Sequence, residues 1–176
     1  MRTPRAPFRR LAALAAAVLA AGTISVATGS PPASAAVSFT STVANQASGD
    51  CADDPNSSAA AGTQLIQYSC NGGTNQSWTF TNLGSGIYKI TASYATSLCL
   101  DVSNSGGSGA NVDLWACSGA NNQKWGAISI SGNIYSLAPQ NATSTRLDVN
   151  GNGTANGTQV DIYNSNGNNN QKWAVN

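Results

Sequence analysis

A period of about 48 residues constrains the fold of this chain more than any other feature. The motif Asn-Gln-x-Trp occurs three times, with its tryptophans at Trp78, Trp125 and Trp173. A second motif, Cys/Arg-x-Asp, precedes each copy, with its aspartates at Asp53, Asp101 and Asp148. Repeats of roughly 20–50 residues are typical of folds in which several units share one core. The sequence therefore predicts three units, at about residues 37–86, 87–133 and 134–176.

The local pattern inside each unit predicts β-structure. Between its two motifs, every unit has a glycine followed by an alternating segment that ends in an aromatic residue: 65–68, 112–115 and 160–163. Gly, Asn and Ser separate such segments, and no stretch after the first 36 residues has helical periodicity. One unit is too small to bury a core alone, so the three share one, either around a pseudo-threefold axis or in a row. The sequence thus predicts an all-β domain.

The N-terminal segment has the features of an export signal. Four arginines precede the apolar stretch 11–21, and Ala33-Ser34-Ala35 matches the small-x-small pattern of a cleavage site. We therefore predict a signal peptide at residues 1–35, a domain at residues 36–176 and a secreted, extracellular protein. The alternative is an uncleaved membrane anchor, which would reach Ala27 only by including Gly22, Thr23 and Ser25. Once the leader is removed, we expect no contact with a membrane.

The charge of the chain after the leader excludes several classes of function. Four of the eight basic residues lie in the leader, so four remain against seven aspartates, and the chain has neither Glu nor His. A nucleic-acid-binding protein needs a basic surface, so we expect no nucleic-acid partner. Without histidine there is no imidazole base and no imidazole zinc ligand. Residues 148–153 resemble the start of a calcium loop, but Gln159 stands where that loop needs Glu, so we predict no metal and no cofactor.

The four cysteines are expected to form two disulfide bonds within units. Cys51 and Cys70 occupy the same two positions in unit one as Cys99 and Cys117 occupy in unit two. Unit three replaces both positions at once, with Arg and Ser. Joint loss is what pairing within a unit predicts, and a secreted protein favours oxidised cysteines.

The repeated tryptophans and the variable aromatic residue have different expected roles. A tryptophan that recurs in every unit most simply fills a shared core. In contrast, Trp115 alternates with Val112 and Leu114 and so points to the opposite face of its strand, and Tyr68 and Tyr163 occupy the equivalent position. An exposed aromatic ring can stack on a sugar ring, and an ionised aspartate accepts hydrogen bonds from adjacent sugar hydroxyls. The alternatives are incidental surface aromatics and aspartates that cap turns.

Three copies of Cys/Arg-x-Asp, a glycine-started strand that ends in an aromatic residue, and Asn-Gln-x-Trp together resemble the ricin B-chain type lectins, carbohydrate-binding module family 13. The resemblance covers nearly the whole chain after the leader. It implies a β-trefoil of twelve strands with three internal repeats. It also implies up to one shallow sugar pocket per repeat, usually for galactose or for xylan- and arabinose-containing chains.

The resemblance assigns sugar contacts unit by unit. In unit two the matching residues are Asp101, Asp113, Trp115, Asn122 and Gln123. In unit three they are Asp148, Asp161, Tyr163, Asn170 and Gln171. In unit one they are Asp53, Tyr68, Asn75 and Gln76, with Asn71 as a further polar contact. Unit one departs from the pattern because Ile66 and Gln67 stand where unit two has Asp113 and Leu114, so either its strand bulges or its pocket is altered.

Sugar binding by a monomeric, non-enzymatic domain is the function that these features favour. A glycosidase would need two carboxylates across one scissile bond, one of them with a raised pKa, and no such pair stands out. The alternative is a trefoil that has lost sugar binding and acts as a protein-interaction module. Since no histidine is present, we expect binding to be constant from about pH 5.5 to 8 and to fade near the ordinary aspartate pKa of about 4.

Overall fold

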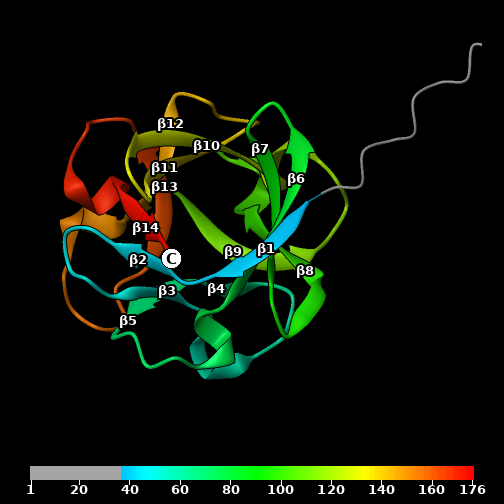
Figure 1. Cartoon of the computed structure of the whole chain (residues 1–176), viewed down its shortest axis with the longest axis horizontal. Coiled ribbons are helices and arrows are strands. Elements are labelled where there is room, and N and C mark those ends of the chain that lie inside the picture. Colours follow the sequence, from blue (N-terminus) through cyan, green and yellow to red (C-terminus); the bar gives the residue numbers. More distant parts are fainter. Residues whose placement is uncertain (1–36) are drawn as a thin grey trace, which may run out of the picture. The chain divides into compact units, whose positions relative to one another are not determined.

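The structure, a computed structural model, describes residues 37–176 (Figure 1). The predicted signal peptide at residues 1–35 lies outside the described residues. The strands are β1 (Ser38–Ser41), β2 (Val43–Asn45), β3 (Cys51–Asp53), β4 (Thr63–Gln64), β5 (Ile66–Tyr68), β6 (Trp78–Gly84), β7 (Ile87–Ala92), β8 (Ala95–Val102), β9 (Ala110–Ala116), β10 (Lys124–Ser131), β11 (Ile134–Pro139), β12 (Thr145–Val149), β13 (Val160–Asn164) and β14 (Trp173–Val175). Short 3-10 helices follow several of them: η1 (Pro55–Ser57), η2 (Thr74–Gln76), η3 (Ser103–Ser105), η4 (Asn121–Gln123), η5 (Asn150–Asn152) and η6 (Asn169–Gln171). Within residues 37–176, no helix has the length and apolar character needed to cross a membrane.

A ring of antiparallel strands forms a closed barrel. Its order is β1, β6, β7, β10, β11, β14 and β2, in which β1 and β2 are one strand interrupted at Thr42. The strand formed by β4 and β5 is interrupted in the same way at Leu65. The 14 strands are therefore the twelve of a β-trefoil with two interruptions. This confirms the all-β class and the three repeats, which surround a common centre instead of lying in a row (Figure 1).

Three hairpins meet at one end of this barrel. They are β3 with β5, β8 with β9, and β12 with β13, and β9 also pairs with both β13 and β4. At their meeting point Gln64 donates from Nε2 to three carbonyl oxygens that occupy equivalent positions in the three units. These belong to Leu65, Val112 and Val160, at 2.9, 3.0 and 2.7 Å. One amide group thus connects all three repeats at the pseudo-threefold axis.

The three repeated tryptophans lie in the core, as predicted. Trp78, Trp125 and Trp173 are at most 1% exposed. Each indole Nε1 donates to a carbonyl oxygen of the Cys/Arg-x-Asp strand in its own unit, at 3.0, 2.9 and 3.0 Å. Because a buried indole N–H needs a partner, this bond fixes the distance between the two motifs of each repeat. The packing therefore explains why both motifs recur with one period.

Both predicted disulfide bonds are present: Cys51 with Cys70 and Cys99 with Cys117. Each joins the two outer ends of a hairpin. In unit three the same place is held by a backbone hydrogen bond from Ser165 N to Ser144 O at 3.0 Å. Unit two has the equivalent backbone bond in addition to its disulfide, from Cys117 N to Ser97 O at 2.9 Å. The hairpin geometry is thus common to both units, with or without a covalent link.

Candidate functional site

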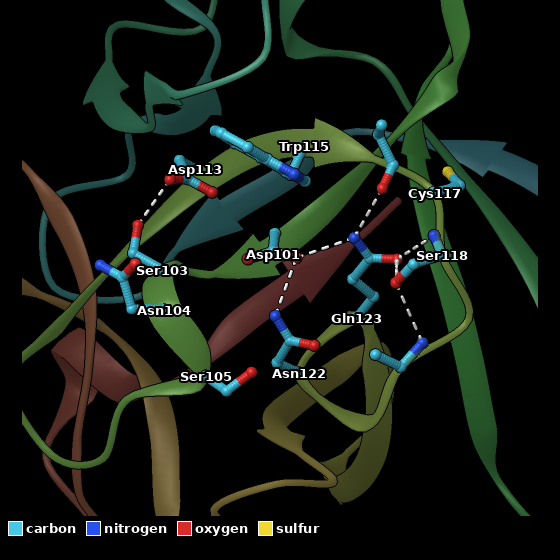
Figure 2. A pocket seen from close by; sticks show the side chains of 12 residues that line it. Asp101, Ser103, Asn104, Ser105, Asp113, Trp115, Cys117, Ser118, Asn122 and Gln123 are labelled. Carbon is cyan, nitrogen blue, oxygen red and sulfur yellow. Dashed lines mark hydrogen bonds between the residues drawn. The ribbon is translucent and has the colours of Figure 1, made fainter.

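The candidate residues of unit two meet on one face of the β8–β9 hairpin (Figure 2). Asp101 on β8 lies directly opposite Asp113 on β9, and Trp115 follows two positions later. Helix η4 brings Asn122 and Gln123 to the other side of Asp101. All five residues line a cavity of about 630 Å³. The structure therefore brings together the complete set that the sequence assigned to this unit.

Asp101 is held in place by two amide groups. Asn122 Nδ2 and Gln123 Nε2 donate to its Oδ2 at 2.9 and 2.8 Å. The Gln123 side chain is 2% exposed, and its Oε1 accepts a hydrogen bond from the backbone N–H of Ser118 at 2.7 Å. Gln123 therefore connects the end of the hairpin to Asp101. Its partners within the protein make it a residue that positions the carboxylate.

Asp113 is held by a residue that the sequence did not single out. Ser103, at the start of η3, donates from Oγ to Asp113 Oδ2 at 2.5 Å. The other carboxylate oxygen, Oδ1, is buried and has no hydrogen-bond partner among the described residues. Such an acceptor costs free energy until a donor reaches it. Asp113 is among the residues that line the cavity of unit two.

Trp115 forms the exposed wall of the cavity and lies against the preceding unit. The residue is 50% exposed. A Cβ atom on Gly62 of unit one would lie 3.4 Å from its Cζ3 atom. Gly62 also has a φ of +87°, in the left-handed region where a side chain is strained. The glycine that starts the strand in unit one thus lets the backbone approach the ring of unit two.

Unit three has a similar arrangement. Asp148 on β12 lies opposite Asp161 on β13, with the half-exposed Tyr163 two positions later. Asn170 Nδ2 donates to Asp148 Oδ2 at 2.9 Å. Gln171 is 1% exposed, and its Oε1 accepts a bond from the N–H of the hairpin end at 2.9 Å, as Gln123 does in unit two. The cavity here measures about 440 Å³.

Two further features of unit three match unit two. Asn150, at the start of η5, donates from Nδ2 to Asp161 Oδ2 at 2.7 Å and so takes the part of Ser103. Asp161 Oδ1 and Asn170 Oδ1 are buried acceptors without a partner among residues 37–176. Gly109 of unit two also contributes to the lining. The shared position of Ser103 and Asn150, two residues after the first aspartate, is the sequence signal that could have identified them.

Burial is the main cause that raises the pKa of the site aspartates. It raises the pKa of Asp148 to about 6, and the negative charge of Asp161 adds to this rise. Burial also raises the pKa of Asp101, Asp113 and Asp161. The expectation that these groups titrate near the ordinary value of about 4 is therefore wrong. It treated them as exposed carboxylates, whereas each is at most 9% exposed.

Unit one keeps only half of the site. Asn75 and Gln76 donate to Asp53 Oδ2 at 2.9 and 2.8 Å, and Tyr68 is 43% exposed. However, Ile66 lies opposite Asp53, where the other units have their second aspartate. The register of β3 against β5 equals that of the other two hairpins, so the strand does not bulge and the pocket is altered instead.

Buried polar residues replace apolar ones around this altered pocket. Gln67 is fully buried at the position of Leu114, and its amide donates to the carbonyl oxygens of residues 153 and 155, both at 3.1 Å. Asp54 is also buried and accepts a hydrogen bond from the Tyr94 hydroxyl. Asn71 Oδ1 accepts from a backbone N–H two residues later at 2.7 Å, so it stabilises a turn. The Gln67 and Asp54 contacts join unit one to its neighbours, whereas the Asn71 bond is local.

Comparison with known proteins identifies the family of the chain. The sequence model of the family described as the Ricin-type beta-trefoil lectin domain matches residues 39–173. No curated protein sequence matches the chain. Among solved structures, the designed threefold-symmetric protein ThreeFoil is similar at 34% identity and a TM-score of 0.74, over 77% of this chain and 96% of its own.

Two natural proteins share the fold at lower identity. An exo-β-1,3-galactanase from Clostridium thermocellum matches at 24% identity and a TM-score of 0.73, over 77% of this chain and 29% of the enzyme. A ricin B-like lectin from Macrolepiota procera, solved in complex with lactose, matches at 20% identity and a TM-score of 0.67, over 78% of this chain and 94% of the lectin. With its three repeats, its core tryptophans and the matching family description, the chain belongs to the ricin-type β-trefoil lectin domain family.

Proposed function

We propose that this protein is a secreted, monomeric lectin that binds galactose or xylan- and arabinan-type glycans at shallow sites in units two and three. The observation that carries the proposal is the same in both cavities. An exposed aromatic ring stands beside a pair of aspartates, one of which has a buried oxygen without a partner. A sugar ring offers an apolar face to the aromatic ring and adjacent hydroxyl donors to the pair of aspartates.

The chemistry of recognition follows from which oxygen atoms are still available. The protein's own hydrogen bonds to Asp101 and Asp113 use Oδ2 in both cases. A sugar hydroxyl therefore donates to Oδ1 of Asp101, and this bond is strong because the acceptor is charged. The half-exposed ring of Trp115 takes the C–H face of the pyranose, which it covers at low entropic cost. Gln123 acts indirectly, by holding Asp101.

The arrangement of the carboxylates favours binding over hydrolysis. Asp101 and Asp113 are direct cross-strand neighbours on one face of a hairpin, and Asp148 and Asp161 are related in the same way. A glycosidase places its two carboxyl groups on either side of the scissile bond, with a proton donor at the leaving oxygen. Two side-by-side carboxylates on one wall contact neighbouring hydroxyls of a single ring. We therefore propose a protein without catalytic activity.

Weak individual sites are expected because the cavities are open and the contacts are few. One ring stack and a few hydrogen bonds correspond to a dissociation constant of about 1 mM, or about −4 kcal/mol. Two sites on one rigid body bind a polymer with a higher apparent affinity than either site has alone, because the second contact is intramolecular. The natural ligand is thus expected to be a polysaccharide or a dense array of glycans.

The test is a titration of the mature protein with galactose, lactose, xylo-oligosaccharides and arabinan, followed by NMR or calorimetry. The matched control is the double variant Trp115→Ala/Tyr163→Ala, which alters only exposed rings and should keep the melting temperature. We expect saturable binding by the parent protein and none by the control. If the folded parent binds none of these glycans, the lectin proposal fails and the protein-interaction alternative is favoured.

A further inference from the structure

We infer that the two intact sites recognise different lengths of sugar chain, with unit two holding two linked rings and unit three holding one. This inference rests on the proposed function, since it assigns a ligand class to each of the same two cavities. Each first aspartate accepts a hydrogen bond from the asparagine of its own unit, so this bond does not distinguish the sites. The difference lies in the walls.

The unit two cavity, at about 630 Å³, is nearly half as large again as the unit three cavity, at about 440 Å³. The additional volume equals that of about six water molecules at roughly 30 Å³ each. Such a space is larger than a single hydroxyl or methyl substituent needs. It admits a large part of a second sugar ring linked to the first.

Side-chain size at equivalent wall positions explains the volume difference. Ser103, Ser118 and Ala120 line the cavity of unit two. The equivalent residues that line the cavity of unit three are all asparagines: Asn150, Asn166 and Asn168. The reverse case occurs twice: unit three has a glycine at the position of Asn104 and the smaller Tyr163 at the position of Trp115. The net effect is a wider opening in unit two.

The wider cavity of unit two also has contacts to offer a second ring. The side chains of Asn104 and Ser105 lie around its edge, away from the Asp101 network, whereas Ser118 Oγ donates to Gln123 Oε1 (Figure 2). Hydroxyl and amide groups both donate and accept, which suits sugar hydroxyls. In addition, the Trp115 indole is a larger platform than the Tyr163 phenol ring. A second ring at unit two therefore gains contacts, whereas the asparagines of unit three occupy that space.

The backbone allows the wall residues to be exchanged between units. Ala120 and Asn168 have nearly identical dihedral angles, with φ of −67° at both and ψ of 164° and 162°. Ser118 Oγ accepts from the N–H of Ala120 at 3.2 Å, and Asn166 Oδ1 accepts from the N–H of Asn168 at 2.8 Å. Each residue therefore makes the same local bond. Reciprocal substitutions should leave the fold unchanged.

The experiment uses two single-site proteins. The variant Tyr68→Ala/Tyr163→Ala keeps only the site of unit two intact, and the variant Tyr68→Ala/Trp115→Ala keeps only the site of unit three intact. Each is titrated with the pairs galactose and lactose, and xylose and xylobiose, after its melting temperature has been checked. For whichever of the two sugar pairs binds, we expect the affinity of unit two to be about fivefold or more higher for the disaccharide, which is the effect of one added hydrogen bond. We expect the affinities of unit three for the two sugars of the pair to agree within about twofold.

Exchanging the wall residues between the two units then tests whether they cause the difference in preference. In the unit two protein, Ser118→Asn/Ala120→Asn should abolish the disaccharide preference while monosaccharide binding remains. In the unit three protein, Asn166→Ser/Asn168→Ala should create that preference. An equal preference at both sites, or a unit two preference that survives the exchange, overturns the inference even though sugar binding is established. Absence of binding to every sugar by both folded proteins refutes the proposed function instead.

Discussion

Replacement of Asp148 by Asn should stabilise the folded protein at neutral pH while it weakens sugar binding at unit three. Burial raises the pKa of Asp148 from its ordinary value of 3.8 to about 6, so the folded state holds the charged form at a cost. The difference corresponds to about 1–3 kcal/mol in the free energy of unfolding. An asparagine has nearly the same shape, and its oxygen still accepts from Asn170. The charge penalty is removed, and the hydrogen bond stays.

The sign of the pH dependence follows from which state binds the proton more tightly. Below pH 3.8 both the folded and the unfolded states are protonated, so Asp148 imposes no penalty. As the pH rises from 3.8 to about 6, the unfolded chain loses its proton first, and the free energy of unfolding decreases. Above about pH 6 the full penalty is present. The stabilisation by Asp148→Asn should therefore be largest at pH 7 and small at about pH 3.5.

Thermal unfolding of the parent protein and of Asp148→Asn at both pH values is the assay. For a domain of this size, about 1–3 kcal/mol corresponds to a rise in melting temperature of roughly 3–10 °C. Asp101→Asn is the matched control in unit two, where burial alone raises the carboxyl pKa, and it should give a smaller rise. A lower melting temperature at pH 7, or the same gain at both pH values, would refute the reasoning.

Three other outcomes are expected. Trp125→Ala should lose about 3–5 kcal/mol of stability because it leaves a cavity in the core. Trp115→Ala should instead keep the melting temperature and lose sugar binding at unit two. One thermal melt and one polysaccharide pull-down per variant distinguish these outcomes. In the Trp115→Ala protein, the remaining sugar affinity, which belongs to unit three, should fall about tenfold from pH 7 to pH 5. The reason is that Asp148 has a pKa of about 6 and its charged form is the stronger acceptor. An unchanged affinity in this range would show that another group controls the site. Gln64→Leu should lower the free energy of unfolding, measured in urea, by about 1–3 kcal/mol, because three converging carbonyl groups lose a shared donor. An unchanged free energy would mean that backbone hydrogen bonds alone hold the three units together at the axis.

The repeat made much of this protein predictable from sequence. A period of about 48 residues with the motifs Cys/Arg-x-Asp and Asn-Gln-x-Trp correctly predicted three units, an all-β class and disulfides within units. It also separated Trp125 in the core from Trp115 on the surface, because strand alternation fixes which side chains point inward. These properties are local or are repeated three times, so each copy supports the others.

Only the tertiary structure decided how the two sites differ from each other and from unit one. Asp113 and Asp161 look alike in sequence, but the donors Ser103 and Asn150 reach them from separate helices. A glycine of the preceding unit also lies close to each site. The pKa of Asp148 likewise depends on how much water its neighbours exclude. Burial, cavity volume and contacts between units are sums over residues far apart in the chain, and no spacing within one repeat contains them.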